Sequence, residues 1–491
     1  MSQYWILAAI LLPFFGGVLI PVLPFSTRRG MCVYIEGVVL ATSAIVAGLL
    51  AGGTTTVFHV VHFVNDLSIS FKIDGMTIVF AALVAVLWPL ATLYAFEYME
   101  HEIRQPYFFM FYTMTYGVTL GIAFASDIMS MYFFYELLTL ATVPLVMFTM
   151  TREAILAVRR YLYYSLGGAA FALMGMIFIM VYGETCEFVM GGVLSREAVG
   201  EHAPVLLVIY FFSFMGFGVK SAIWPFSSWL PQAGVAPTPV TALLHAVAVV
   251  NAGAFAIIRL TYYSFGIEFL RGTWVQSACM AVSMFTIVYG CSRALKESHI
   301  KRRLAWSTVS NLSYIIFGAT MMSPQGLVGA LCHFVFHGVM KIGAFLCAGA
   351  FMHQTGCSYV YEMDGMGKKM KVVFGCFTLC ALGLMGVPGF AGFISKWNLT
   401  SAAVFGESPL GWLGVACLLI SALLTAIYLL SVVARAFFPK REMEDKVQAE
   451  ITDPGWMMCV PLLLSGICTV LLGWFSHPLV EFFRDVARGI Y

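Results

Sequence analysis

Apolar runs of about twenty residues follow one another along nearly the whole chain, separated by short polar connections. A helix needs about 20 apolar residues to cross a bilayer, and its backbone polar groups must be satisfied within the protein. The 491-residue chain is 60% hydrophobic and 11% charged, which leaves too little polar surface for a soluble protein. We therefore predict an all-α polytopic membrane protein that forms one integral membrane domain, residues 1–491.

The apolar runs predict about fourteen membrane-spanning helices. The first run, MSQYWILAAILLPFFGGVLIPVL, has no basic flank before it and no small-residue cleavage site after it, so we expect a retained span instead of a signal peptide. The expected spans are 4–23, 32–52, 74–96, 107–126, 128–150, 161–182, 204–224, 239–262, 273–292, 306–322, 326–352, 372–395, 409–438 and 456–476.

Basic residues are distributed unevenly over the connections between these spans. If successive spans alternate in direction, eighteen Lys and Arg residues fall on one side and five on the other. Cytoplasmic loops carry the excess of basic residues, so we predict an even number of spans in the cell inner (cytoplasmic) membrane, with both termini outside the cytoplasm. Arg259, near the end of its run, is expected to snorkel outward. The larger set is Arg28, Arg29, Arg104, Arg152, Arg159, Arg160, Arg293, Lys296, Lys301, Arg302, Arg303, Lys368, Lys369, Lys371, Arg435, Lys440, Arg441 and Lys446, and the smaller set is Lys72, Arg196, Arg271, Arg484 and Arg488.

Three lysines and one glutamate remain inside the predicted spans, namely Lys220, Lys341, Lys396 and Glu136. Glu36 lies closer to the end of its run. A lysine at the centre of a bilayer costs roughly 3 kcal/mol on insertion scales, so ionisable residues at that depth indicate an ion or proton path. For Glu136 taken alone, pairing with a helix or a partner subunit is the alternative interpretation.

Lys220 and Lys396 each lie near a predicted helix break. Pro225 follows Lys220 by five residues, and proline removes a backbone donor, so we expect the helix to stop or kink just past the lysine. Pro388 precedes Lys396 in a glycine-rich segment that would also interrupt a helix. Corresponding breaks beside a buried lysine indicate that the two halves are repeats of one unit, as in transporters whose ion sites lie at discontinuous helices.

His333, His337 and Lys341 are spaced four residues apart, so they share one face of a helix. Imidazole titrates near neutral pH and has two nitrogens with which to relay a proton, so this pattern favours a proton path. Two packed core histidines are one alternative and a metal site is another. A metal site is disfavoured because further ligands are missing nearby and the lysine would repel a divalent cation.

His245 and Asn251 lie on the span that follows Lys220. Each side chain can hydrogen-bond to water or to a lysine, and each can equally be a satisfied polar group without a role in transport. A carboxylate about 4 Å from a buried lysine stabilises the charged amine by about 4 kcal/mol at an effective dielectric near 20. Moving Glu136 toward or away from Lys220 would therefore switch the lysine between holding and releasing a proton.

The twelve cysteines are scattered through the spans, and Cys376 and Cys380 are the only close pair. No CxxC or CxxCH pattern is present to hold zinc, an iron–sulfur cluster or haem. We expect packing cysteines, no metal site and no cofactor-binding site on this chain, so any redox chemistry must take place on another subunit. The net charge of +2 gives no indication of nucleic-acid binding.

Two polar stretches lie outside the predicted spans. Apolar and polar residues alternate in 53–73, which predicts an extracytoplasmic hairpin. His59 and His62 in this hairpin are expected to be solvated. The tail HPLVEFFRDVARGIY is expected to form a short amphipathic helix lying on the membrane.

The motifs around the buried polar residues resemble the antiporter-like membrane subunits shared by respiratory complex I, Mrp-type cation/proton antiporters and membrane-bound energy-converting hydrogenases. The matching segments follow one another in order from about residue 70 to residue 430. They are FYELLTL around Glu136, GVKSAIWPFSSWLPQA around Lys220, APTPVTALLHAVAVVNAG through His245, LAWSTVSNLSYIIFG at 304–318, HFVFHGVMKIGAFLCAGA through Lys341, and GVPGFAGFISKW ending near Lys396.

This resemblance implies fourteen helices, two inverted five-helix repeats at 107–262 and 273–438, and discontinuous helices at the seventh and twelfth spans. Two half-channels would be joined by a lateral polar axis. Asn251 departs from the pattern, because some relatives carry lysine there. The chain also ends before the long lateral helix of the largest complex I homologues, so it resembles the shorter members.

The resemblance also implies roles for the buried polar residues. Glu136 and Lys220 would act as the coupling pair, and Lys396 would be the terminal gate. Lys341 would connect the two halves together with His333 and His337.

Two functions are consistent with these patterns. In the first, the chain is the ion-translocating, non-redox subunit of a hydrogenase-type or complex I-type enzyme that moves protons or sodium ions. Its partners would be membrane subunits of the same family, small membrane subunits and peripheral redox subunits that carry iron–sulfur clusters, nickel–iron or flavin. In the second, the chain belongs to an Mrp-type Na+/H+ antiporter without a redox partner. A subunit that keeps the helices for assembly but no longer conducts is a third alternative.

Overall fold

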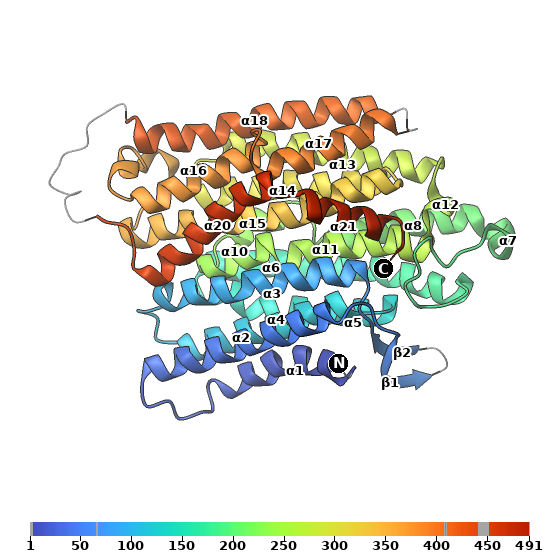
Figure 1. The fold of residues 1–491 in the computed structure, drawn as a ribbon, viewed down its shortest axis with the longest axis horizontal. Coiled ribbons are helices and arrows are strands. Elements are labelled where there is room, and N and C mark those ends of the chain that lie inside the picture. The colour runs from blue at the N-terminus through green and yellow to red at the C-terminus, as the bar shows by residue number, and fades with distance from the viewer. Residues whose placement is uncertain (1–2, 65–66, 407, 409, 440–450, 491) are drawn as a thin grey trace.

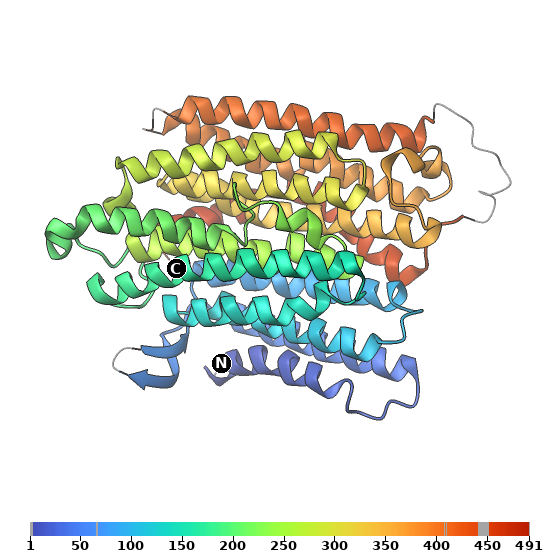
Figure 2. The same ribbon diagram turned by 180° about the vertical axis from the view of Figure 1, so that it is seen from behind.

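The computed structural model describes residues 3–490, apart from 65–66, 407, 409 and 440–450. Three of the basic residues assigned above to the cytoplasmic side, Lys440, Arg441 and Lys446, lie outside the described residues. The described chain is a bundle of long helices that lie side by side along one common direction (Figures 1 and 2).

Helices account for most of the described chain. The first half forms α1 (Tyr4–Leu19), α2 (Arg28–Ala51), α3 (Gly75–Tyr98), α4 (Gln105–Phe124), α5 (Ile128–Val146), α6 (Arg152–Tyr182), α7 (Arg196–Val199), η1 (Gly200–His202), α8 (Ala203–Gly218), α9 (Trp229–Ala233), α10 (Thr238–Ala246) and α11 (Val249–Ile258). The second half forms the π-helix η2 (Arg259–Phe265), α12 (Ile267–Leu270), α13 (Trp274–Lys296), α14 (Ile300–Thr320), α15 (Pro324–Thr355), η3 (Val360–Glu362), η4 (Met366–Lys368), α16 (Lys371–Met385), α17 (Ala391–Phe405), α18 (Gly411–Phe437), α20 (Trp456–Trp474) and α21 (His477–Ala487).

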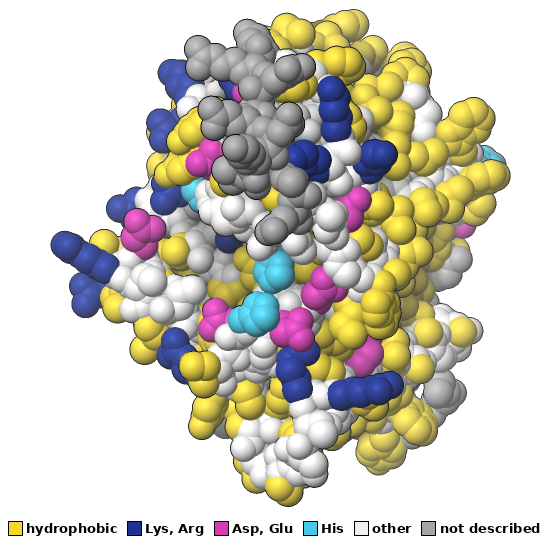
Figure 3. Space-filling model, turned by 90° about the vertical axis from the view of Figure 1, so that its left-hand side faces the viewer, with side chains coloured by type: hydrophobic (Ala, Val, Ile, Leu, Met, Phe, Trp, Pro, Cys, Tyr) yellow, Lys and Arg dark blue, Asp and Glu magenta, His cyan; other side chains and the backbone are white. Residues whose placement is uncertain are grey.

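Eleven of the described helical stretches are long and apolar enough to cross a membrane. Two further apolar helices, α1 and α16, are shorter. The protein is therefore a multi-pass membrane protein. Lys and Arg side chains gather at one end of the bundle, where α2 begins with Arg28 and α16 begins with Lys371 (Figure 3).

Capping side chains fix where several of the long helices begin. Asp74 precedes α3 and accepts a hydrogen bond from Thr77 N at 2.9 Å, while Asp127 precedes α5 and accepts one from Ser130 N at 2.6 Å. Ser323 caps α15 in the same way. These side chains satisfy backbone donors that would otherwise have no partner at the start of a helix.

The only strands in the described chain form the predicted hairpin, β1 (Phe58–Val64) and β2 (Leu67–Phe71), which pair antiparallel. His59 and His62 are exposed, as expected. Backbone bonds join β2 and the residue after it to the end of α4 and the connection before α5, with Lys72 N donating to Phe124 O at 2.9 Å and Ser126 N donating to Ser70 O at 3.1 Å. The hairpin is thus anchored at the end of the bundle where α5 begins (Figure 1).

Helix α15 lies at the centre of the bundle and packs against α3, α10, α14, α16, α17, α20 and α21. Almost all of its side chains are buried. Gly343 allows a close approach, because a Cβ there would lie 2.7 Å from Cys380 Sγ on α16 and 2.8 Å from Ser465 Cβ on α20. Small residues of this kind let helices pack tightly in a membrane, where the lipid provides no hydrophobic driving force between them.

The amphipathic tail forms α21, and its apolar side chains pack onto α15 and α3. Val480 and Phe483 are buried in this contact. The tail is thus a helix, as predicted, and one face of it belongs to the protein core.

Three of the helical stretches are interrupted. As predicted, α16 ends before Pro388, at Met385, and α17 begins at Ala391. Gly386 and Gly389 have φ of 87° and 90°. Glycine adopts such values more readily than other residues, so these two glycines favour the turn between α16 and α17. Helix α8 was expected to stop or kink just past Lys220. It ends earlier, at Gly218, so the prediction placed the end of this helix too late.

The third interruption was not predicted. The expected continuous span 239–262 is divided between α10 and α11 at Val247 and Ala248. Neither residue is a helix breaker, so the sequence contains no local signal for this interruption.

Candidate functional site

Lys220 lies in the non-helical segment between α8 and α9, and its side chain is only 1% exposed. The backbone groups freed by this break find partners on other elements. Trp229 Nε1 donates to Val219 O at 2.8 Å, and Trp224 N donates to Thr286 Oγ1 at 3.1 Å. Irregular backbone inside a membrane protein is stable only when it is satisfied in this way.

Glu136 on α5 faces Lys220, with Glu136 Oε1 and Lys220 Nζ 3.8 Å apart. This separation is within ion-pair range but too long for a hydrogen bond. The amine instead donates to Tyr135 O and lies 3.3 Å from the centre of the Tyr135 ring. Lys220 is therefore held by a carbonyl and an aromatic ring, beside a carboxylate that keeps some freedom, since 23% of its side chain is exposed.

The segment that carries Lys220 packs directly onto α11. A Cβ at Gly253 would lie 2.6 Å from Ser221 N, and Ser221 Oγ donates to Val250 O at 3.2 Å. Asn251, on the same helix, donates from Nδ2 to Ala246 O at 2.9 Å. Asn251 thereby satisfies a carbonyl freed by the break between α10 and α11, which is a structural role.

His245 lies in the last turn of α10, just before that break. Its ring is fully buried against the Phe345 ring, with the centroids 4.7 Å apart. Neither ring nitrogen has a hydrogen-bond partner among the described residues. Lys341 and Lys301 lie within electrostatic range of the ring. A buried imidazole with two free nitrogens has capacity to bind water or a proton.

Lys341 occupies the middle of α15 and is fully buried. Its Nζ donates to Ser307 Oγ at 2.8 Å and approaches Leu304 O at 3.5 Å, both on α14. No carboxylate pairs with Lys341 among the described residues. Hydroxyl and carbonyl oxygens alone hold this amine, so it can release its proton without breaking an ion pair.

His337 and His333 lie four and eight residues before Lys341, on the same face of α15. Their rings are stacked with centroids 5.8 Å apart. His333 Nδ1 is 2.9 Å from Ser395 Oγ, whereas both nitrogens of His337 are without a hydrogen-bond partner in the described part of the chain. The described residues contain no group of three or more His, Cys, Asp or Glu side chains that could hold a metal ion.

Lys396 lies on α17 and reaches back to the end of α16. Its Nζ donates to Leu384 O at 2.8 Å and to Met385 O at 2.9 Å. These are the last carbonyls of α16, where the helix dipole favours a cation. The amine also lies 5.4 Å from the centre of the Tyr314 ring, which lies against the His333 ring with the two ring planes tilted by 33°.

The structure brings His245, His337, His333, Lys341 and Lys396 within electrostatic range of their neighbours. Among the described residues no hydrogen bond joins Lys220 to His245, since both ring nitrogens of His245 are without a partner. We call all these groups, together with Glu136 and Lys220, the row. It begins at Glu136 and Lys220 and passes His245 at the break of α10. It continues along α15 through Lys341, His337 and His333, and ends at Lys396. Such a row of donors and acceptors can pass a proton from group to group if water fills its gaps.

Two expectations for basic residues were wrong. Lys301, expected in a connection between spans, lies instead in the first turn of α14, where it is 4% exposed and donates from Nζ to Ala236 O at 2.8 Å. Arg259 does not snorkel outward but is fully buried, with two 2.7 Å hydrogen bonds to Asp74. Sequence position alone could not reveal these partners, because Asp74 and Arg259 are 185 residues apart.

Glu36 lies outside the row, on α2. Its Oε2 is buried and has no hydrogen-bond partner among the described residues.

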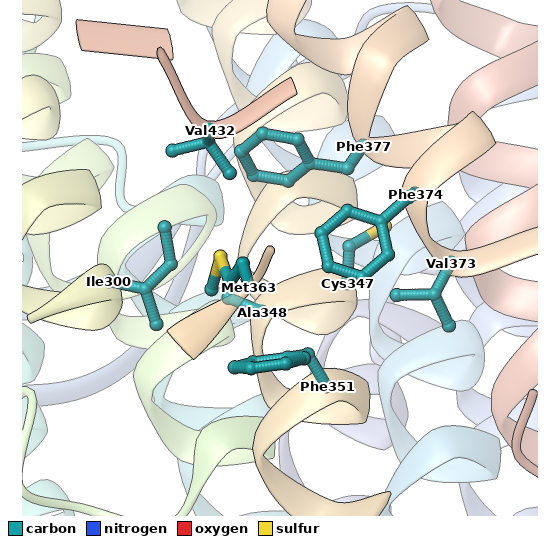
Figure 4. A pocket seen from close by; sticks show the side chains of 9 residues that line it. All are labelled: Ile300, Cys347, Ala348, Phe351, Met363, Val373, Phe374, Phe377 and Val432. Carbon is teal, nitrogen blue, oxygen red and sulfur yellow. The ribbon is translucent and has the colours of Figure 1, made fainter. Parts of the chain in front are cut away.

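Two cavities away from the row are lined by apolar side chains. A cavity of about 10 Å³ near the basic end is lined by side chains such as Ile300, Phe351, Phe374 and Val432 (Figure 4). A larger one of about 300 Å³ lies between α3, α15 and α21 and is lined entirely by apolar side chains. Ordered water needs two to four polar partners, so neither cavity belongs to an ion path.

Comparison with known proteins identifies the family. Residues 125–425, more than half of the chain, match the family model described as NADH:quinone oxidoreductase/Mrp antiporter, TM. The chain belongs to this family. Residues 62–109 match a second model of the antiporter-like family, described as NADH-Ubiquinone oxidoreductase (complex I), chain 5 N-terminus. The protein is thus an antiporter-like membrane subunit of complex I/Mrp type.

Similar proteins include a subunit of an NADH-quinone oxidoreductase and a subunit of an Na(+)/H(+) antiporter. NADH-quinone oxidoreductase subunit N of Desulforudis audaxviator is 29% identical over 93% of this chain and 92% of its own length. Na(+)/H(+) antiporter subunit A1 of Staphylococcus aureus is 26% identical over 96% of this chain, which spans 61% of that relative.

Two solved structures share the fold of this antiporter-like subunit. One is a chain of the membrane-bound sulfane sulfur reductase (MBS), an archaeal respiratory membrane complex, with a TM-score of 0.86 and 21% identity over 99% of this chain and 97% of that one. The other is a chain of the Mrp complex from Dietzia sp. DQ12-45-1b, with a TM-score of 0.84 and 20% identity over the same fractions.

Proposed function

We propose that this antiporter-like chain is the ion-translocating subunit of a redox-driven membrane complex of hydrogenase or complex I type. The observation that carries the proposal is the pair of Glu136 and Lys220, buried beside a helix break and 3.8 Å apart without a hydrogen bond between them. A small movement of Glu136 changes the electrostatic energy of the charged amine, which couples a conformational change to proton release.

The remaining members of the row have complementary roles in this proposal. His245 and Lys341 carry the proton from the first half of the chain to the second. His337 and His333 pass it on to Lys396, which acts as the terminal gate. Asn251 supports the path indirectly, because its amide holds the broken ends of α10 and α11 together.

The topology proposed for this function has fourteen spans. Eleven are the long apolar stretches described above, and the other three are α1, α14 and the pair α16–α17. Two inverted five-helix repeats, 107–262 and 273–438, place the breaks beside Lys220 and Lys396 in corresponding positions. The basic end of the bundle faces the cytoplasm, and both termini lie outside it, in the inner membrane.

The partners are membrane subunits of the same family, small membrane subunits and peripheral redox subunits. In this proposal the redox subunits carry the iron–sulfur clusters, nickel–iron or flavin, and this chain carries no redox cofactor. The likeness to subunit N of an NADH-quinone oxidoreductase over most of both chains favours a redox complex.

A second function is favoured by the likeness to an Na(+)/H(+) antiporter subunit and to the fold of an Mrp complex. In an Mrp-type exchanger the same row would move protons against sodium ions, with no electron transfer. Purification of the native complex and identification of its subunits by mass spectrometry separates the two functions. Subunits with iron–sulfur, nickel–iron or flavin sites are expected, and a complex of membrane subunits alone would overturn the redox assignment.

Replacement of Lys220 by Ala tests ion translocation itself. We expect proton uptake by inverted membrane vesicles to be lost while the complex still assembles. Full uptake by the Lys220→Ala complex would leave this chain with an assembly role only.

A further inference from the structure

The apolar cavity between α3, α15 and α21 is the place where the central helix meets the outside of the bundle. Its volume is about 300 Å³. From Gly326 to Phe351, the one side chain of α15 that is not buried by the described residues is Val335, and it lines this cavity. Val339, one turn further along the same face, lines it as well. The cavity therefore gives access to α15 from outside the described part of the bundle.

Helix α3 opens to the outside at the same place. From Gly75 to Trp88 its side chains are buried except for Ile78, Ala82 and Val86, which are spaced four residues apart and share one face of the helix. All three line the cavity, and Val86 is 63% exposed. The open face of this half of α3 thus coincides with the wall of the cavity.

The surroundings of the cavity decide what can fill it. Helices α3 and α15 are both long and apolar enough to cross the membrane, so hydrocarbon lies outside them. Every side chain that lines the cavity is apolar, so water has no side-chain hydrogen-bond partner there. Protein interiors contain few voids larger than a water molecule. A space of this size beside the bilayer is therefore filled by hydrocarbon.

The cavity has the length of one leaflet of the bilayer. On α3 it extends from Ile78, in the first turn of the helix, to Leu87. At 1.5 Å per residue these two positions are about 14 Å apart along the helix axis. The hydrocarbon core of a bilayer is about 30 Å thick, so the cavity extends from one membrane surface to about the middle. An acyl chain of that leaflet covers the same depth.

Helix α21 places cations near the surface end of the cavity. Its apolar face lines the cavity, and its last turns lie at the end of the bundle where α3 begins (Figure 1). Arg484 and Arg488 are exposed in these turns and pair with Glu481 and Asp485. A guanidinium group has five N–H donors and matches the geometry of a phosphate, so each arginine can bind a phosphate as well as its carboxylate. The charge at this end thus complements a phospholipid head group.

We propose that one acyl chain of a membrane phospholipid occupies this cavity, with the phosphate of the same lipid at Arg484 and Arg488. The acyl chain packs between Val86 on α3 and Val335 on α15. Val335 lies two residues from His333 and from His337, a rotation of about 200° around the helix, so the lipid supports α15 from the face opposite to the row. This binding site is independent of the proposed ion translocation.

The first test is photo-cross-linking of the unmodified native complex. The probe is a phosphatidylethanolamine that carries a diazirine in one acyl chain, and bulk lipid is removed with detergent before illumination. We expect cross-links to α3 near Val86 and to α15 near Val335. Leu419 on α18 is the matched position, because it is 64% exposed and lies outside this cavity. Equal labelling around Leu419 and around the cavity would overturn the proposal, and so would an unlabelled cavity.

The second test fills the cavity with protein. Val86→Trp places a large side chain where the acyl chain is proposed to lie, and Leu419→Trp makes the same change outside the cavity. We expect the yield of cross-links at α15 to fall at least about tenfold in Val86→Trp and to be unchanged in Leu419→Trp. Ala82→Phe fills the same space from the neighbouring turn and replaces Val86→Trp if that variant fails to assemble. An unchanged yield in the assembled cavity-filling variant would contradict a lipid at this place.

Native mass spectrometry of the detergent-washed complex identifies the occupant. We expect one retained phospholipid per copy of this chain, and its loss in Val86→Trp but not in Leu419→Trp. Replacement of Arg484 and Arg488 by Gln should weaken retention of the lipid while the acyl-chain cavity is unchanged. An isoprenoid quinone in place of the phospholipid would overturn the assignment, as would a helix of a partner subunit cross-linked to position 335. Retention of the same number of lipids by Val86→Trp would also overturn it.

Discussion

Lys220 and Glu136 are an ion pair that is not hydrogen bonded, since Nζ and Oε1 are 3.8 Å apart while the amine donates to Tyr135 O. The lysine lies in an interrupted segment, and the glutamate lies on the uninterrupted α5. Movement of one element relative to the other therefore changes the distance between the charges without breaking a hydrogen bond between them.

Replacement of Glu136 by Gln should lower coupled proton transfer by about 10²-fold or more, because the neutral amide no longer stabilises the charged amine. The measurement is the proton uptake of inverted vesicles, together with the amount of complex in the membrane. Glu153→Gln, at an exposed position in the first turn of α6, is the matched control. Unchanged uptake with Glu136→Gln would remove the coupling pair from the mechanism.

The sequence predicted the parts of this site that depend on local signals. Runs of about 20 apolar residues locate the long helices because the backbone must satisfy its own hydrogen bonds in lipid. The break before Lys396 was predictable because Pro388 and its neighbouring glycines cannot continue a helix. The spacing of His333, His337 and Lys341 predicted that they share one face of a helix, and all three lie on α15.

The parts that were missed depend on distant contacts. The break between α10 and α11 has no proline or glycine and is stabilised by the Asn251 amide. Lys301 stands in a run of basic residues typical of a loop, yet its amine is buried against Ala236 O. The end of α8 was placed too late because Trp229 and Thr286 satisfy the backbone around Lys220.

Replacement of Lys341 by Met should block transfer between the two halves of the chain. Methionine keeps much of the apolar volume but provides no group that carries a proton. We expect loss of coupled proton uptake with normal assembly, measured in the same vesicles. Lys296→Met changes an exposed lysine at the end of α13 and should leave uptake intact. Persistent uptake with Lys341→Met would mean that the central stripe serves packing alone.

His299 precedes α14, outside the membrane-spanning helices, and predicts a pH dependence of stability. Burial, together with Lys301 and Arg302, lowers the pKa of His299 to about 4. An unfolded histidine has a pKa near 6.5, so the unfolded state binds the proton first as the pH falls. Stability should therefore decrease between about pH 6.5 and pH 4, and His299 should have no such effect above that window.

His299→Gln is the variant that isolates this dependence. The difference in unfolding temperature between pH 7 and pH 4.5 should be smaller for His299→Gln than for the unmodified protein in detergent. His59→Gln, at an exposed position in β1, is the control. An identical acid sensitivity of the His299→Gln and unmodified proteins would contradict the burial of a neutral imidazole at this position.

Asp74 and Arg259 join the start of α3 to the end of the interrupted stretch α10–α11, through two hydrogen bonds of 2.7 Å. Breaking a buried ion pair by removing one partner typically costs about 3–5 kcal/mol. Without Arg259, Asp74 keeps only the longer 3.6 Å contact with Lys72, and without the Asp74 charge, Arg259 has no carboxylate partner among the described residues. Arg259→Met should therefore lower the unfolding temperature of the purified protein strongly, and Asp74→Asn should do the same. The double variant Asp74→Asn/Arg259→Met should be less destabilised than the sum of the two, because no unpaired charge of the pair remains. Strictly additive effects would show that the two side chains stabilise the protein independently and that their ion pair does not hold the broken stretch in place.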